Sequence, residues 1–253
     1  MGSTGTDLSG RVALVTGASS GLGVRFAEVL AEAGAAVVAG GRRLDRCQAV
    51  ADRISSRGGR CLAVELDVRS DESMVAAVDA AEARFGLVDI LVNNAGIPDA
   101  QYATRMSTEL VDNVLDTNVR APWMLSCEVA RRLIKAKQPG RIVNISSIGS
   151  FFYSGGGAAL YSVTKAAVNR MTEALAVEWS AFHINVNAIA PGAFMSEMME
   201  GMIQRQGDPS ALFPRKRMGQ PEQLDSTLLY LVSPASEMVT GTIITVDDGQ
   251  SPR

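Results

Sequence analysis

The 253-residue sequence predicts a single α/β domain with a doubly wound parallel sheet of about seven strands and helices on both faces. Short, mostly apolar runs rich in β-branched residues recur along the chain, as is typical of parallel strands that are buried on both faces. Longer segments with helical spacing separate these runs, which favours helical crossovers between the strands. The expected strands cover residues 12–15, 36–39, 62–64, 90–92, 142–145, 186–189 and 243–246.

The expected helices follow from the spacing of apolar residues between the strands. After the first strand, Leu22, Phe26 and Leu30 fall on one face of a helix, and Gly34 follows as a stop signal. Helical spacing is also found in three later segments, residues 109–118, 121–136 and 161–181. Right-handed crossovers would place the carboxyl ends of the strands at one edge of the sheet, where ligands bind in such folds.

The chain is long enough to bury one large core, and we assign residues 11–253 to a single domain. Residues 1–10 are small and polar, so we expect a disordered tail there rather than a secretory signal. Residues 194–220 are rich in Met, Gly and Pro and lack a long regular apolar pattern. We expect this stretch to be irregular and to act as a mobile lid over the substrate.

Composition and charge exclude several classes of protein. The formal net charge of −3 gives no case for binding nucleic acid or an anionic membrane, and no apolar run is long enough for a membrane helix. The three cysteines have no CxxC spacing and only one histidine, His183, is present, so no metal site is expected. We therefore expect a soluble, cytoplasmic protein with free thiols and a small-molecule partner.

A glycine-rich segment, TGASSGLG over residues 16–23, lies between the first strand and the first helix. Glycines allow a sharp turn and close approach of a ligand, and the helix N-terminus offers free N–H groups to a pyrophosphate. This placement favours a dinucleotide site over a plain tight connection. The expected phosphate-binding residues are Gly17, Ser19, Ser20, Gly21, Leu22 and Gly23.

The end of the second strand indicates which dinucleotide is bound. NAD sites usually have an Asp or Glu there for the ribose 2′-hydroxyl, whereas this chain has Gly41 followed by Arg42 and Arg43. Guanidinium groups would hold a 2′-phosphate by charge-assisted hydrogen bonds, so we expect NADP(H) to be preferred over NAD(H). The alternative is that Arg42 and Arg43 are solvated basic residues at the start of a helix and bind no ligand.

A candidate acid/base centre combines a tyrosine with a lysine. Tyr161 and Lys165 are four residues apart on a predicted helix, so their side chains share one face, and a protonated lysine should lower the pKa of the tyrosine. Such a tyrosine can donate a proton to a carbonyl oxygen and take it back. Ser147, just past the fifth strand, could polarise the same carbonyl. Asn118 is an indifferent helix former in a helical stretch, which a kink or a water-binding role would explain.

Together, TGxxxGxG, the NNAG of residues 93–96, the mid-helix Asn, Ser…YxxxK and a late Pro-Gly resemble the main branch of the short-chain dehydrogenase/reductase family, from about residue 11 to the C-terminus. The resemblance implies a single Rossmann-type domain and a tetrad of Asn118, Ser147, Tyr161 and Lys165. In it, Lys165 also holds the nicotinamide ribose and Asn118 holds a proton-relaying water. It further implies cofactor contacts from Asp67, Val68, Asn94, Gly96, Pro191, Gly192, Phe194 and Ser196. A homotetramer with residues 121–136 and 161–181 between subunits is implied as well.

Three departures from the family pattern are present. Ser147 lies fourteen residues before Tyr161 instead of the usual thirteen, which implies an extra loop residue within 151–157 and leaves Ser146 as an alternative catalytic serine. Ser196 replaces the usual threonine but keeps the hydroxyl. The VDDG of residues 246–249 replaces VDGG, which is expected to alter a tight turn without touching the chemistry.

The leading prediction is an NADP(H)-dependent carbonyl reductase or alcohol dehydrogenase for a hydrophobic ketone or secondary alcohol. Apolar side chains that could line such a pocket are Phe151, Phe152, Tyr153, Met195, Met198, Met199 and Met202, although ordinary packing would also explain them. One alternative is a 3-oxoacyl-(acyl carrier protein) reductase, with Arg215, Lys216 and Arg217 as a candidate docking patch. A non-catalytic nucleotide-binding sensor is another, against which the complete Ser-Tyr-Lys set argues.

Overall fold

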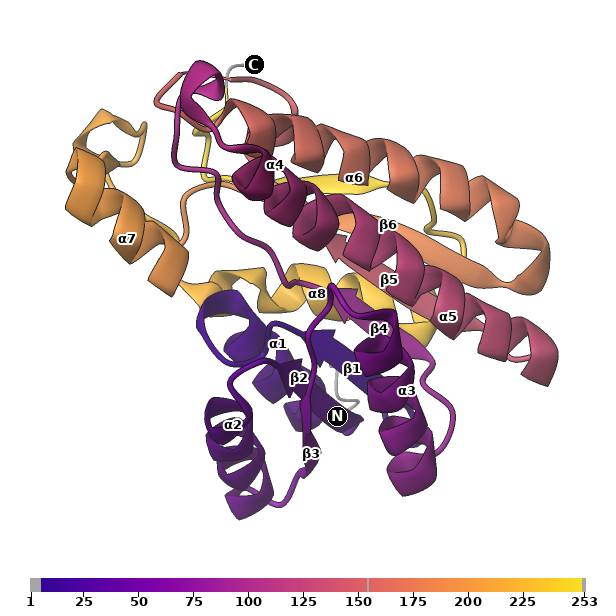
Figure 1. The fold of residues 1–253 in the computed structure, drawn as a ribbon. Coiled ribbons are helices and arrows are strands. Elements are labelled where there is room, and N and C mark those ends of the chain that lie inside the picture. The colour runs from indigo at the N-terminus through magenta and orange to yellow at the C-terminus, as the bar shows by residue number, and fades with distance from the viewer. Residues whose placement is uncertain (1–5, 154, 252–253) are drawn as a thin grey trace.

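A computed structural model describes residues 6–153 and 155–251 of the chain, and these form one parallel sheet with the strand order β3-β2-β1-β4-β5-β6-β7 (Figure 1). All neighbouring strands pair in parallel. The predicted fold class is confirmed. The strands are β1 Val12–Thr16, β2 Ala36–Gly41, β3 Arg60–Glu65, β4 Ile90–Asn93, β5 Gly140–Ile145, β6 Ile184–Pro191 and β7 Ile243–Val246.

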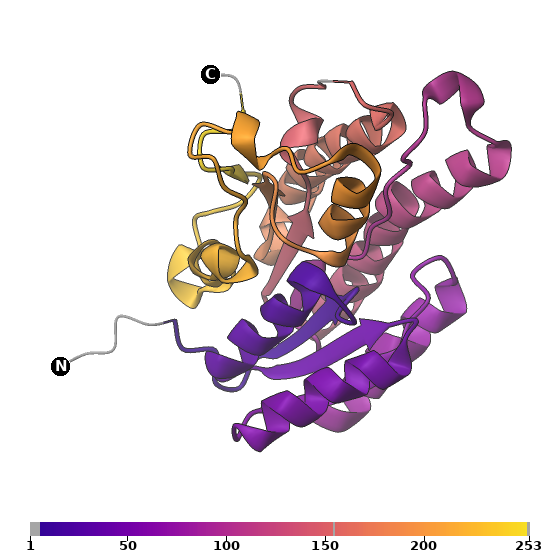
Figure 2. The same cartoon turned by 90° about the vertical axis from the view of Figure 1, so that its left-hand side faces the viewer.

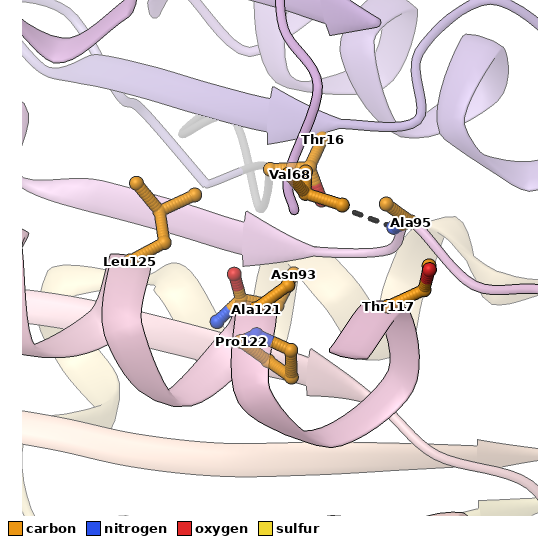
Figure 3. A pocket seen from close by; sticks show the side chains of 8 residues that line it. All are labelled: Thr16, Val68, Asn93, Ala95, Thr117, Ala121, Pro122 and Leu125. Carbon is orange, nitrogen blue, oxygen red and sulfur yellow. Dashed lines mark hydrogen bonds between the residues drawn. The ribbon is translucent and has the colours of Figure 1, made fainter. Parts of the chain in front are cut away.

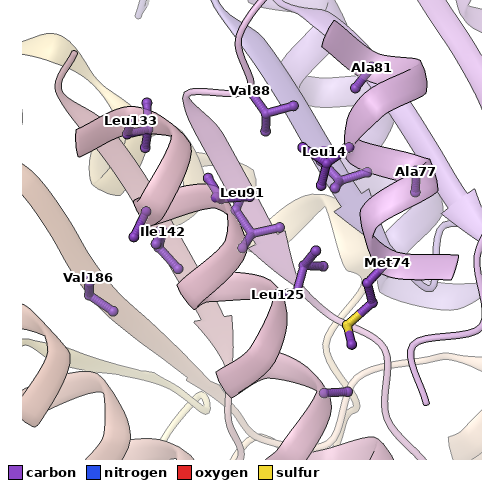
Figure 4. Packing of buried hydrophobic residues seen from close by; sticks show 14 of the residues in the cluster. Leu14, Met74, Ala77, Ala81, Val88, Leu91, Leu125, Leu133, Ile142 and Val186 are labelled. Carbon is purple, nitrogen blue, oxygen red and sulfur yellow. The ribbon is translucent and has the colours of Figure 1, made fainter. Parts of the chain in front are cut away.

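Helices cover both faces of the sheet. They are α1 Gly21–Glu32, α2 Leu44–Ser56, α3 Asp71–Phe85, α4 Thr108–Leu115, α5 Ala121–Ala136, α6 Ala159–Glu178, α7 Glu197–Gln206 and α8 Asp225–Val232. One apolar cluster joins α3, α5 and α6 to the sheet, and a second joins α1, α2 and α8 to the opposite face. In Figure 4, Met74 of α3 and Leu125 of α5 pack toward Leu14 and Leu91 of the central strands.

The strand order reverses direction between β1 and β4, because β2 and β3 lie on one side of β1 whereas β5, β6 and β7 lie beyond β4. In open parallel sheets, ligands bind outside the carboxyl ends of the strands at such a switch point. The glycine-rich turn follows β1 and the NNAG segment follows β4, so the two motifs meet at this crevice.

The N-terminal residues that the structure describes differ from the expected tail. Residues 1–5 lie outside the described part, but Leu8 is fully buried and its backbone N–H donates to the carbonyl of Ala33 at 2.7 Å. Its side chain belongs to the same cluster as Phe26 and Leu30 of α1. The average polarity of residues 1–10 conceals this apolar anchor, which ties the end of the expected tail to α1.

The predicted lid is a loop that is closed at its base. Phe194 and Gly219 form a parallel bridge, in which Met195 N–H donates to the Gly219 carbonyl at 2.9 Å. Within the loop, α7 is a regular helix, so the prediction of an irregular segment is wrong for its first half. The methionines at 195, 198, 199 and 202 have helical spacing, a signal that the high Met, Gly and Pro content obscured. Figures 1 and 2 show α7, in orange, outside the layers that cover the sheet.

None of the described residues of α7 is buried, in contrast to the helices that pack on the sheet. The described part of the chain contains no helix that combines the length and apolar character needed to cross a membrane.

Candidate active site and cofactor cleft

The glycine-rich turn after β1 has a backbone that only glycine accommodates without strain. Gly17 and Gly21 have φ values of +66° and +55°. A Cβ on Gly17 would lie 3.0 Å from the Cα of Ala95, and one on Gly23 would lie 2.3 Å from the carbonyl oxygen of Gly17. The turn is therefore packed tightly against the end of β4, and its shape depends on these three glycines.

The N-terminus of α1 is open to an anion. Ser20 is the N-cap residue, yet its side chain forms no capping hydrogen bond within the described part of the chain, and the first turn carries no acidic residue. The first N–H groups of a helix have no partner inside the helix and lie at the positive end of its dipole. Gly21, Leu22 and Gly23 therefore present donors suited to a pyrophosphate, as the sequence predicts.

Thr16 and Asn94 connect the two motifs at the switch point. The Thr16 hydroxyl accepts a hydrogen bond from the N–H of Ala95 at 3.0 Å (Figure 3). It also accepts from the N–H of Asn94 at 3.0 Å, and the Asn94 side chain donates to the Thr16 carbonyl at 2.9 Å. Asn94 thus supports the turn. Thr16 is absent from the predicted site residues, although it is the first residue of the TGxxxGxG motif.

A small cavity lies beside this network, between β1, β4 and α5 (Figure 3). Its volume of about 10 Å³ has room for no more than about one water molecule. Val68 lines it together with Thr16 and Asn93. Val68 is also part of the apolar core, so its side chain is packed between α3 and the sheet.

The arginines after β2 have different surroundings. Arg43 donates to the hydroxyl groups of Ser19 and Ser20 at 3.2 and 2.9 Å, and it forms an ion pair with Glu197 of α7 at 2.8 Å. Arg46 pairs with the same carboxylate at 3.3 Å. Arg42 is exposed, and its charge helps to lower the pKa of Asp67. Sequence reasoning missed Glu197, because it comes from a segment about 150 residues away.

The cations that face Glu197 and Asp67 lower the pKa values of both carboxyl groups. Hydrogen bonds from Arg43 and from the Ser20 hydroxyl lower the pKa of Glu197 to about 2. The Arg69 side chain, 3.2 Å from Asp67, is the main cause of the lowered pKa of Asp67. Asp67, an implied cofactor contact, is therefore held by Arg69 just after β3.

Tyr161 and Lys165 lie one turn apart in α6, as predicted. The Lys165 ammonium is 5.6 Å from the centre of the Tyr161 ring and donates to the Ile145 carbonyl at 2.7 Å. Only 5% of Lys165 is exposed, and burial lowers its pKa from 10.5 to about 8. The group is still mainly protonated at pH 7.

The expected lowering of the Tyr161 pKa is not found. Burial raises the pKa of Tyr161, a hydrogen bond with Ser147 lowers it, and the charge on Asp99 raises it further. The Lys165 ammonium bonds to a carbonyl and lies over the ring, so its charge does not outweigh burial. The tyrosine is consequently a protonated phenol at neutral pH, which is the form that can donate a proton.

The structure distinguishes the two candidate serines by their partners. The Ser146 hydroxyl is buried and donates to the backbone carbonyl of Lys165 at 3.2 Å. The Ser147 hydroxyl bonds with the Tyr161 phenol and also accepts from the N–H of Gly149 at 3.1 Å. Ser147 is thus the serine beside the tyrosine, despite the extra residue in the intervening loop.

Asn118 lies in a π-helical turn, Asp116–Arg120, which interrupts the path from α4 to α5. Such turns are frequent at functional sites, and this one is the helix irregularity that the asparagine suggested. The Asn118 side chain is buried, accepting from the Ile97 N–H and donating to the Ile97 carbonyl, each at 2.9 Å. A Cβ on Gly96 would be 3.4 Å from the Asn118 amide oxygen and 3.6 Å from the Lys165 nitrogen. All three residues therefore border one small space.

Asp99, like Thr16 and Glu197, is a site residue that sequence reasoning missed. It is only 3% exposed, and its carboxylate accepts from the backbone N–H of Tyr161 at 3.0 Å and of Ala100 at 2.7 Å. The N-cap of α6 is Ala158, which has no side-chain acceptor, so Asp99 serves the first turn of α6 in its place. The 62-residue separation from Tyr161 leaves no local signal in the sequence.

The segment after β6 approaches the turn before α1. Ser196 caps α7 by accepting from Met199 N–H at 3.2 Å, and its Cβ lies 3.1 Å from where a Cβ on Gly21 would be. Gly192 N–H donates to the Val246 carbonyl at 2.9 Å, just beyond Pro191. Phe194 is buried in the core, so any ligand contact from it would come from the backbone.

The altered turn after β7 has its own partners. Asp248, which replaces the usual glycine, has a left-handed backbone with φ of +54°. Its carboxylate pairs with Arg217 at 2.7 Å and with Arg215 at 3.2 Å. The aspartate that departs from VDGG therefore forms two ion pairs near the end of the predicted lid. Their cations, Arg215 and Arg217, are two of the three residues of the candidate docking patch.

Aromatic side chains of the loop that follows Ser147 are partly exposed. Phe151 and Tyr153 are about half exposed, at 56% and 49%. Residue 154 lies outside the described residues. Farther along this loop, the Gly156 carbonyl accepts from the side chain of Gln206 at 2.9 Å. The end of α7 therefore contacts the loop that follows Ser146 and Ser147, whereas the start of α7 contacts Arg43.

Comparisons with known proteins agree with this geometry. A family model described as short chain dehydrogenase matches residues 11–207. The 2-dehydro-3-deoxy-D-gluconate 5-dehydrogenase of Dickeya dadantii is 37% identical, with 96% of each chain covered. A 3-oxoacyl-(acyl-carrier-protein) reductase of Vibrio cholerae is 36% identical, with 96% of this chain and 98% of that protein covered. A short-chain type dehydrogenase/reductase from Mycobacterium marinum has a similar crystal structure, with a TM-score of 0.94, 35% identity and 98% of each chain covered.

Proposed function

The chain belongs to the short-chain dehydrogenase/reductase family, and from this premise we propose that it transfers a hydride between NADP(H) and a hydrophobic ketone or secondary alcohol. The observation that carries the proposal is the arrangement of Ser147, Tyr161 and Lys165 around one space at the carboxyl edge of the sheet. Burial raises the pKa of Tyr161 and leaves the pKa of Lys165 at about 8, so the phenol and the ammonium both carry their protons at pH 7, as carbonyl reduction requires.

The cofactor fits the residues of the cleft. The open N-terminus of α1 and the glycine backbone before it suit a pyrophosphate. Arg42 is exposed just after β2. An acidic residue at this position would repel a 2′-phosphate, whereas an arginine attracts it. Arg43 lies beside it and reaches the serines of the turn. These features support NADP(H) over NAD(H).

In the proposed reaction, the reduced nicotinamide supplies the hydride that adds to the carbonyl carbon. Tyr161 gives its phenolic proton to the carbonyl oxygen as the hydride arrives, so the ketone becomes a secondary alcohol and the tyrosine a phenolate. The Ser147 hydroxyl, hydrogen bonded to the phenol, orients the same oxygen. The Lys165 ammonium stabilises the phenolate by its charge and can hold the nicotinamide ribose. Oxidation runs through the same groups in reverse.

Proton resupply is proposed to involve Asn118. Its side chain bonds with Ile97 and donates to the Thr164 hydroxyl at 3.2 Å. The Asn118 amide oxygen and the Lys165 nitrogen both lie near Gly96, and we propose that the relaying water binds in this space.

Exposed apolar side chains favour a hydrophobic substrate. Phe151 and Tyr153, in the loop after Ser147, and Met198 of α7 are exposed. The thioester reductase remains the alternative, but Arg215 and Arg217 of its candidate docking patch are paired with Asp248. A panel of ketones and alcohols should include sugar acids, because relatives with such a substrate in their names are 35% to 37% identical. Turnover with any member would exclude a non-catalytic sensor.

The experiment that tests the chemistry is Tyr161→Phe, followed by NADPH absorbance with the best substrate of the panel. The ring packing is kept and only the proton donor is lost, so the NADPH Kd should stay within about twofold while turnover falls about 10²- to 10⁴-fold. Turnover above about a tenth of wild type would reject Tyr161 as the acid/base. Arg42→Ala tests the cofactor, since it should weaken NADPH far more than NADH.

We also propose that the chain forms a homotetramer. Trp123 of α5 and Val163 of α6 are 44% and 61% exposed, although such residues are usually covered. Both lie on the helices that the family resemblance places between subunits. Large exposed apolar side chains on neighbouring helices are consistent with an interface between copies of the chain.

A further inference from the structure

Glu197, the first residue of α7, forms a two-pronged ion pair with an arginine of the expected cofactor site. Its two carboxylate oxygens accept from the two terminal nitrogens of Arg43 at 2.9 and 2.8 Å. Arg46 donates to one of the same oxygens at 3.3 Å. A parallel pair of hydrogen bonds is the geometry with which a guanidinium also binds a phosphate. The carboxylate therefore takes up the donors that a phosphate would use.

Arg43 is in the right place to meet the 2′ position of the cofactor. It follows the end of β2, where the residue that recognises the adenosine ribose is found in this type of fold. It also donates to Ser19 and Ser20, so its guanidinium lies between that strand end and the phosphate-binding turn. A 2′-phosphate carries about 1.5 to 2 negative charges at pH 7, if it titrates like other phosphate monoesters. It would meet a negative charge already on Arg43.

We propose that Glu197 is a specificity-determining residue for the cofactor: its carboxylate competes with the 2′-phosphate for Arg43 and Arg46. The inference rests on the proposed use of NADP(H). Arg42 is exposed and creates the preference for a 2′-phosphate, whereas Glu197 limits its strength. NADH has a hydroxyl at this position, so its binding does not displace the carboxylate. Glu197 thereby keeps the difference in affinity between NADPH and NADH smaller than Arg42, Arg43 and Arg46 alone would make it.

The test measures Kd values of NADPH and NADH by titration calorimetry with the full chain, for wild type and Glu197→Gln. Glutamine keeps the size of the side chain but removes its charge. We expect NADPH to bind about three- to tenfold more tightly, the range expected for release of a competing ion pair and of like-charge repulsion. NADH should change by less than about twofold, and the gain for NADPH should shrink at high salt because ions screen exposed charges.

Two controls make the result specific. Glu109→Gln removes a charge from the first turn of another helix, α4, where Glu109 is exposed and forms no ion pair among the described residues, so it should leave both Kd values unchanged. Adenosine 2′,5′-bisphosphate and ADP replace the dinucleotides as probes that do not reach the substrate side. The gain from Glu197→Gln should appear with the bisphosphate and not with ADP.

The outcomes separate this inference from the proposed function. An unchanged ratio of NADPH to NADH affinity in Glu197→Gln overturns the competition, even if wild type prefers NADPH. Weaker NADPH binding overturns it as well, since Glu197 would then position Arg43 for the phosphate. If wild type shows no preference but Glu197→Gln acquires one, the competition holds and the proposed preference of the native protein fails.

Discussion

Replacement of Asp99 by asparagine removes a buried charge from beside Tyr161 while the size of the side chain is kept. In the structure, the carboxylate accepts from two backbone N–H groups, those of Ala100 and Tyr161. An asparagine amide has one oxygen acceptor, and its NH₂ group is a donor, so one of the two N–H groups loses its partner. A hydrogen bond to a charged group contributes about 1.5–3 kcal/mol, and we expect the free energy of unfolding to fall by about 2 kcal/mol.

For a chain of this length, a loss of about 2 kcal/mol lowers the melting temperature by about 4–8 °C. The variant should also have a lower pKa at Tyr161, because the charge on Asp99 raises it in the native protein. The fall of kcat/KM for ketone reduction that accompanies loss of the Tyr161 proton, the tyrosine limb of the pH profile, should therefore move to lower pH.

Calorimetry and a pH–rate series on the same preparation measure both effects, and Asp99→Glu is the matched variant that keeps the charge. A structural role alone would lower the melting temperature in both variants without moving the tyrosine limb. A wild-type melting temperature together with an unchanged pH profile in Asp99→Asn would refute the positioning of Tyr161 by Asp99.

Four further predictions use other parts of the molecule. Reduction should slow as pH rises above about 8, by about tenfold per unit, because Lys165 then loses the charge that stabilises the phenolate; a flat kcat/KM up to pH 10 would contradict this. Asp248→Gly should change the free energy of unfolding by less than about 1 kcal/mol, because glycine removes the strain of the left-handed backbone and so offsets the loss of the ion pairs with Arg215 and Arg217. Urea unfolding measures this change, and a loss above about 3 kcal/mol would show that the ion pairs stabilise the fold. Light scattering should give four times the 26.7 kDa chain mass, and Trp123→Glu should give smaller species; a monomeric wild type at micromolar concentration would end the tetramer proposal. Without ligand, residues 194–220 should be the least protected internal stretch in hydrogen exchange, and NADPH with substrate should slow their exchange. Full protection in the ligand-free protein would end the lid proposal.

The parts of the fold that are local in sequence could be predicted closely. The period of apolar residues gives each buried strand, and the alternation of strands with helices gives the parallel sheet, because few other topologies bury both faces. Tyr161 and Lys165 could be paired for the same reason, since four residues make one turn of helix. The order of motifs along the chain then brings the turn after β1 and the end of β4 to one edge.

The parts that were missed depend on contacts between distant segments or on burial. Asp99 serves a helix 62 residues away, and Glu197 reaches Arg43 from the other end of the domain, so no spacing rule links them. Leu8 was concealed by the polar average of its neighbours. The direction of the Tyr161 pKa was wrong because a sequence gives the distance along a helix but not the carbonyl that Lys165 selects or the depth of burial.

The bridge between Phe194 and Gly219 has a consequence for how this scaffold can diversify. Because the two ends of the loop are tied together at the edge of the sheet, the residues between them form an insert whose length does not alter the path of the chain on either side. On the lid proposal, an exchange of this insert accommodates new substrates while the contact of the Phe194 ring with Gly219 stays fixed. Glu197 lies inside the insert, so, on the competition proposed for it, the same exchange would also change the choice of cofactor.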